Sequence, residues 1–173
     1  MKKIFSALFF ILVASSTCQA ATPVRISDYN VNDFYYAYNN VALNIVKNNF
    51  TLNDLPMYVS TSDLYDTYIT SCGGDGHGAI IAFFANRQGH VSKLTLTGKA
   101  ESKINVEIAF GALLNVLVTL GASDREVKFF IDQFLTGRRE VYHYCSAIKR
   151  YIAVEILPEQ DNLIYIRVTA FTN

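Results

Sequence analysis

The sequence has no excess of charge of either sign, no tryptophan and no low-complexity stretch. Its 173 residues include 15 lysines and arginines against 15 aspartates and glutamates, so the formal net charge is zero. Proteins that bind nucleic acid usually present a basic surface, and this balance therefore predicts no nucleic-acid partner. Because 51% of the residues are hydrophobic, the chain is expected to fold into an ordered globule.

Motifs of the common enzyme classes are also missing. The chain contains no GxSxG, HExxH, Walker or dinucleotide-binding pattern. Acidic pairs such as Asp63 and Asp66 are typical of turns and surfaces, since a glycosidase needs two carboxylates that face each other across a cleft. We therefore expect no cofactor and no bound metal.

The first twenty residues have the composition of a secretory signal peptide. Lys2 and Lys3 precede an apolar run that is too short to span a bilayer, and small and polar residues follow up to Ala20. We predict that residues 1–20 are removed and that residues 21–173 form one domain, periplasmic or secreted from a bacterium. Cys18 leaves open a lipid-modified N-terminus as an alternative.

The stretch from Ile104 to Leu120 predicts a helix that is apolar around nearly its whole circumference. Such a helix is buried on most sides, and its length and internal polar residues favour the core of a globular domain over a membrane. Gly121 ends it, and Ser123 with Glu126 forms a capping box that begins a second, amphipathic helix up to Gly137.

Helical and strand periodicities predict a single α+β domain. A first helix is expected from Asn30 or Asn32 to about Asn48, with the two asparagines at 48 and 49 ending it. Residues 57–61 read as a short strand or an extended segment. Two meanders of three strands each are expected, at residues 65–72, 79–85 and 90–97, and at residues 140–146, 151–157 and 163–171. The order is helix, strands, two helices, strands, with an antiparallel sheet or a pair of sheets packed by about three helices.

Two cysteines remain once the leader is removed, Cys72 and Cys145. An even pair in an exported chain predicts a disulfide, because the compartment is oxidising. Such a bridge would close a loop of about 70 residues and would stabilise the fold by roughly 4 kcal/mol in the chain-entropy model.

The glycine-rich stretch SCGGDGHG, residues 71–78, is the most unusual local sequence. Its functional interpretation is a small hydrolase in which Cys72 is the nucleophile and His77 the base, or a metal held by Asp75 and His77. Its structural interpretation is a loop between two strands with Cys72 in the disulfide, which we favour because a disulfide removes the nucleophile. His143 lies among apolar neighbours and is expected to be a core residue rather than a ligand.

Tyrosine and arginine gather in the C-terminal strands. By alternation, Tyr151, Tyr165 and Arg167 point away from the isoleucine and valine face of their strands. The candidate partner surface is made of Tyr144, Tyr151, Tyr165, Arg167 and Arg150. These residue types are enriched where binding energy concentrates in protein interfaces, although strand propensity and cross-strand packing alone also favour them on an exposed sheet face.

These observations favour an exported, non-catalytic binding protein, such as an inhibitor, an immunity-type protein or an envelope accessory factor. Its expected partner is another protein in the envelope or outside the cell. Two alternatives stay open: the small hydrolase centred on Cys72, Asp75 and His77, and a carrier whose apolar helix at residues 104–120 lines a ligand cavity.

Overall fold

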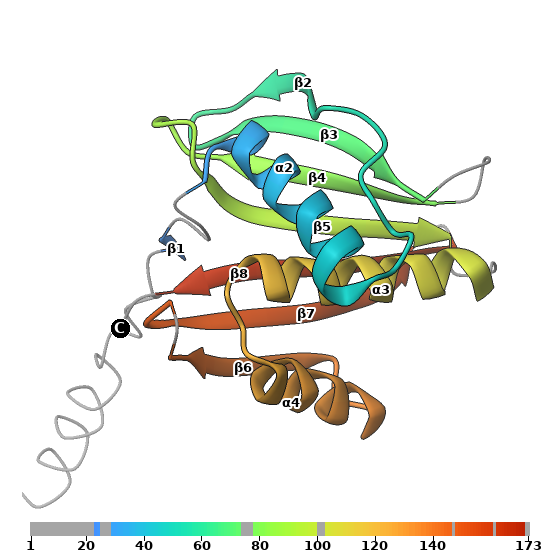
Figure 1. Ribbon diagram of the computed structural model, residues 1–173. Helices are drawn as coiled ribbons and strands as arrows, with labels where there is room; N and C mark the ends of the chain where they lie inside the picture. The colour runs from blue at the N-terminus through green and yellow to red at the C-terminus, as the bar shows by residue number, and fades with distance from the viewer. Residues whose placement is uncertain are drawn as a thin grey trace, which may run out of the picture.

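The computed structural model describes residues 23–24, 29–73, 78–99, 103–146, 148–160 and 162–171. They form one α+β domain with a seven-stranded antiparallel sheet and three helices, which confirms the predicted fold class (Figure 1). The predicted signal peptide, residues 1–20, lies outside the described residues.

The sheet is continuous, and its strands follow the order β2-β3-β4-β5-β8-β7-β6. Their bounds are β2 (Met57–Thr61), β3 (Asp66–Cys72), β4 (Ala79–Ala85), β5 (Val91–Lys99), β6 (Glu140–Cys145), β7 (Arg150–Gln160) and β8 (Leu163–Phe171). A two-residue strand, β1 (Pro23–Val24), pairs with the end of β8. The first meander thus has four strands instead of three, because residues 57–61 pair with β3.

The two meanders join where β5 pairs with β8. Their register runs from Lys93 opposite Thr169 to Lys99 opposite Leu163. The last strand in sequence order therefore lies in the interior of the sheet, between β5 and β7.

The helices are α2 (Val31–Asn40), continued by the wider π-helical turn η1 (Val41–Val46), α3 (Lys103–Thr119) and α4 (Asp124–Leu135). The Asn30 side chain caps α2 by accepting the N–H of Asp33 at 2.9 Å. The helical segment ends at Val46 and its C-cap is Lys47, with a φ of 58°, so the left-handed cap lies one residue before the asparagines at which it was expected.

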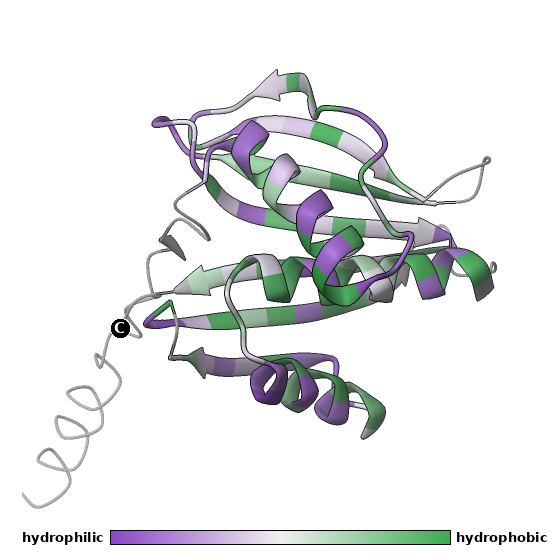
Figure 2. Cartoon of the chain, viewed as in Figure 1, coloured by the Kyte–Doolittle hydropathy of each residue, from purple (hydrophilic) through white to green (hydrophobic). Residues whose placement is uncertain are grey.

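All three helices lie on one face of the sheet (Figure 1). The ring of Phe34 on α2 meets Phe83 of β4 edge-on, α3 packs on β5, and α4 packs on β6. Leu113 and Leu117 of α3 are buried, and apolar residues follow α3 along its length in Figure 2. The prediction that this helix belongs to the core is confirmed, and within the described residues no helix is long and apolar enough to cross a membrane.

The predicted disulfide is wrong in this fold. Cys72 ends β3 and Cys145 ends β6, and four strands, β4, β5, β8 and β7, separate them. With neighbouring strands about 4.8 Å apart, five such steps set the two residues at least about 24 Å apart, whereas a disulfide needs Cα atoms about 4.4–6.8 Å apart. Both cysteines are buried free thiols.

Candidate functional site

The sheet face opposite the helices carries four of the five residues of the candidate partner surface. Residues that pair across strands share a face, and Tyr144 pairs with Tyr151. Their rings meet edge-on with centroids 5.2 Å apart. Tyr165 and Arg167 share this face, since Arg167 lies opposite Glu155 on β7. We call this surface, away from the helices, the open sheet face.

Register separates the fifth residue from the others. Arg150 lies opposite Cys145, whose buried side chain is on the helix side of the sheet, so Arg150 does not share the open face. Tyr165 lies six residues before Phe171, the partner of Tyr151, which places it about 20 Å from the tyrosine pair. The described structure therefore brings Tyr144 and Tyr151 together and leaves Tyr165 at the far end of the face.

Charged side chains occupy the middle of the open sheet face. Arg167 Nη1 lies 3.0 Å from Glu155 Oε2. Lys93 lies over the ring of Phe84, with Nζ 4.1 Å from its centroid. Burial, and secondarily the charge of Arg167, lowers the pKa of Lys93. The middle of the open sheet face thus carries two cations, Lys93 and Arg167, and one carboxylate, Glu155.

Tyr142 belongs to the same surface but was not among the predicted site residues. It pairs with Ala153, it is 54% exposed, and its hydroxyl donates to the Glu140 carboxylate. This hydrogen bond, followed by burial and the charges of Glu140 and Glu155, raises the pKa of Tyr142 to about 12. The spacing of two residues between Tyr142 and Tyr144 was the signal in the sequence that could have identified it.

The thiol of Cys72 is not set up as a nucleophile. It is fully buried, and burial raises its pKa to about 11 although a hydrogen bond with Tyr38 opposes the shift. A thiol in that state stays protonated at neutral pH, and the thiolate is the reactive form. Asp75 and His77, the other residues of the hydrolase interpretation, lie outside the described residues.

Cys72 takes part instead in a buried polar cluster around the carbonyl oxygen of Phe50. The Tyr38 hydroxyl donates to this oxygen at 2.9 Å, Asn115 Nδ2 donates at 3.2 Å, and Cys72 Sγ donates at 3.2 Å. Tyr38 and Asn115 are fully buried, so these bonds satisfy groups that water cannot reach. The cluster ties α2 and α3 to the segment that leads into the sheet.

His143 is a packing residue in the described structure. Its ring lies on the helix side, with centroids 4.4 Å from Phe129 and 5.9 Å from Phe130. The described residues contain no group of three histidine, cysteine, aspartate or glutamate side chains that is arranged to hold a metal.

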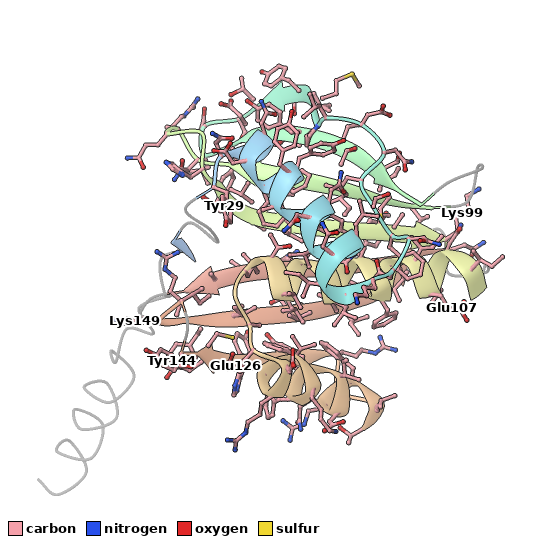
Figure 3. All side chains as sticks on the ribbon, in the orientation of Figure 1. Tyr29, Lys99, Glu107, Glu126, Tyr144 and Lys149 are labelled. Carbon is pink, nitrogen blue, oxygen red and sulfur yellow. The ribbon has the colours of Figure 1, made fainter. Side chains whose placement is uncertain are left out.

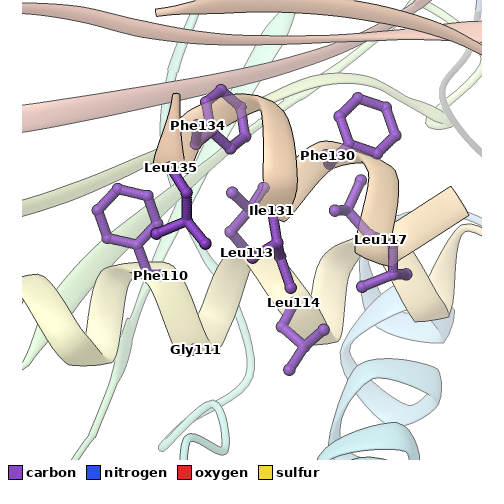
Figure 4. Close-up of a pocket in the computed structure, with 10 residues that line it drawn as sticks. Phe110, Gly111, Leu113, Leu114, Leu117, Phe130, Ile131, Phe134 and Leu135 are labelled. Atoms are coloured by element: carbon purple, nitrogen blue, oxygen red, sulfur yellow. The ribbon is translucent and has the colours of Figure 1, made fainter. Parts of the chain in front are cut away.

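An apolar groove of about 460 Å³ separates α3 from α4 (Figure 4). Only apolar residues line it: Phe110, Gly111, Leu113, Leu114, Leu117, Val127, Phe130, Ile131, Phe134 and Leu135. Leu135 is 81% exposed and Ile131 44% exposed, so part of the rim faces solvent. Because the lining offers no hydrogen-bonding side chain, the groove suits hydrocarbon and not a polar group.

Comparisons with protein-family models, with curated proteins and with solved structures give no match to this chain.

Proposed function

We propose that this protein is a non-catalytic binding protein, exported from a bacterium, that contacts another protein through its open sheet face. The observation that carries the proposal is the placement of all three helices on one side of the sheet (Figure 1). The other side presents an aromatic pair, Tyr144 with Tyr151, together with Arg167 and Lys93. Tyrosine and arginine are enriched among residues that dominate binding energy in interfaces.

The experiment places a photoactivatable cross-linking residue at Tyr151 and, as a matched control, at Tyr36. Tyr36 is an exposed tyrosine of α2, on the helix side. Irradiation in the producing cell is expected to join one specific partner to the protein through position 151 and not through position 36.

The double variant Tyr151→Ala with Arg167→Ala should then bind the purified partner more weakly by about 2 kcal/mol or more, with its thermal melt close to that of the parent. Equal cross-linking at both positions, or unchanged affinity of the folded double variant, contradicts the proposal.

The groove between α3 and α4 supports a second candidate function, transport of an apolar ligand. A ligand with a long hydrocarbon chain would replace water along a lining that is entirely apolar. Titration with a fluorescent fatty acid tests this function. Saturable binding at one site, reduced at least tenfold by Leu114→Asp and unchanged by the Tyr151 and Arg167 variant, is the expected result for a carrier. Absence of saturable binding contradicts it.

A further inference from the structure

The strand β6 lies at an end of the sheet and pairs with β7 alone among the described strands. Its backbone orientation follows from one hydrogen bond just before it, in which Ile156 donates its N–H to the carbonyl oxygen of Arg139 at 2.6 Å. In antiparallel pairs, hydrogen-bonded and non-hydrogen-bonded residue pairs alternate along the strands. The backbone N–H and C=O groups of the odd-numbered residues of β6 therefore point toward β7. Those of the even-numbered residues, Tyr144 among them, point to the outer edge of the sheet.

This edge is regular over its six residues. The register from Glu140 opposite Glu155 to Cys145 opposite Arg150 runs without a shift. The other end strand, β2, is interrupted by a bulge between Tyr58 and Ser60, and such a bulge discourages the addition of another strand. The strand β6 has neither a bulge nor a proline, and a single carboxylate, at its first position, is its only fixed charge. Its outer edge is therefore suited to pairing with an extended chain.

Cations flank both ends of β6. Arg138 and Arg139 are exposed immediately before it, and Lys149 is exposed in the turn that follows it, close to Tyr144 in Figure 3. None of these three cations has a carboxylate within salt-bridge distance in the described part of the chain. Six residues of strand place the two groups of cations about 20 Å apart. A segment with carboxylates at both ends complements this pattern whether it runs parallel or antiparallel to β6.

We propose that the outer edge of β6 accepts an extended segment of a partner protein, with acidic residues at both ends of an uncharged core that is about as long as β6. Backbone hydrogen bonds to the edge would supply affinity, and the flanking cations would select acidic ends. This inference rests on the proposed function, because it names the kind of partner segment that the protein binds. It also extends the same surface, since the side chain of Tyr144 belongs to the open sheet face.

The experiment selects ligands from a random twelve-residue peptide library displayed on phage, with the purified protein as bait. Recovered peptides are expected to carry aspartate or glutamate at both ends and residues of high strand propensity between them. Peptides with basic ends, or with the apolar spacing of an amphipathic helix, overturn the proposal, as does a failure to enrich any sequence.

Two variants at one position then separate the backbone from the side chain. Tyr144→Pro removes an N–H that points to the edge and leaves the hydrogen bonds to β7 in place, whereas Tyr144→Ala removes only the side chain. A selected peptide is expected to bind Tyr144→Pro at least tenfold more weakly than Tyr144→Ala. Equal affinity for the two variants overturns edge pairing.

Further measurements keep the test decisive if Tyr144→Pro does not fold. Methylation of alternate backbone nitrogens of the peptide should abolish binding for only one of the two alternating sets, because only one set faces β6. Equal effects of both sets overturn the proposal. A dimer of the protein that persists in Tyr144→Ala and is dissociated by a selected peptide would assign the edge to a second copy, which also overturns the proposal. The double variant Tyr151→Ala with Arg167→Ala shows whether edge binding persists when the rest of the open sheet face is altered, so the two proposals can fail separately.

Discussion

Gly111 of α3 faces the ring of Phe50, and a methyl group at Gly111 would overlap that ring. The backbone of Phe50 has little freedom to retreat, because its carbonyl oxygen accepts hydrogen bonds from Tyr38, Asn115 and Cys72. In the sequence, Gly111 is only one residue of a helix that is apolar around nearly its whole circumference. Its role depends on a contact between segments that are far apart in the sequence, which helical periodicity does not report.

Gly111→Ala is therefore expected to lower the free energy of unfolding by about 1–3 kcal/mol through overpacking. The higher helix propensity of alanine would by itself stabilise the protein by about 1 kcal/mol relative to glycine. A net loss of stability therefore shows that the added methyl group meets the ring of Phe50. Urea unfolding measures it. In a Phe50→Ala background the same substitution should be neutral or stabilising, and a destabilisation of equal size there would contradict the argument.

At the scale of elements, the bounds of α3 and the capping box of α4 were predicted closely because their signals are local. The capping box is present, with Glu126 Oε2 accepting the N–H of Ser123 at 2.7 Å. A second role of Glu126 was not visible in the sequence: its other oxygen accepts the N–H of Ser146, after β6, at 3.0 Å. One carboxylate thus joins the start of α4 to the end of β6.

Glu126→Gln is expected to destabilise the protein by about 1.5–3 kcal/mol at pH 7, the usual range for a hydrogen bond to a charged group. Burial alone would raise the pKa of Glu126, but the hydrogen bonds from Ser123 and Ser146, with the charge of His143, hold it below its usual value. A depressed pKa in the folded state means that the stabilisation is present above the unfolded pKa of about 4.3 and is lost as the pH falls through the folded value. Unfolding measured from pH 7 to pH 3 should show the difference from the parent shrinking toward zero. Asp124→Asn, in the same first turn, is the control and should show a smaller effect.

At the scale of the whole molecule, strand alternation predicted which residues share a face, but it did not predict the order of the strands. The disulfide failed for that reason: the count of cysteines carries no information on which strands are neighbours. Arg150 is adjacent to Tyr151 in β7, so strand alternation itself sets its side chain on the other face from Tyr144 and Tyr151. A cavity along the helix at residues 104–120 was predicted only as an alternative. The sequence shows that this helix is apolar, but it does not show how far α4 lies from it.

The position of the two cysteines in the sheet predicts two protected thiols. Burial raises the pKa of Cys72 to about 11 and that of Cys145 to about 12, so both are protonated at pH 8. A thiol reagent without reductant should leave both unmodified in the folded protein and modify both after unfolding, with Cys18 as a third only if the leader is retained. Ser60→Cys, exposed on β2, is the control and should react at once. If the unfolded chain is not modified, the two cysteines form a disulfide and the free-thiol prediction is wrong.

The interior position of β8 has a consequence for the order in which the sheet can form during synthesis. Residues 163–171 leave the ribosome after every other strand that the structure describes, yet they supply the strand that joins the two meanders. Until they emerge, β5 and β7 each have an unpaired side, and the sheet exists only as two separate parts. A nascent chain that stops before residue 163 therefore exposes two long backbone edges at once, and these are the edges that a chaperone would have to cover.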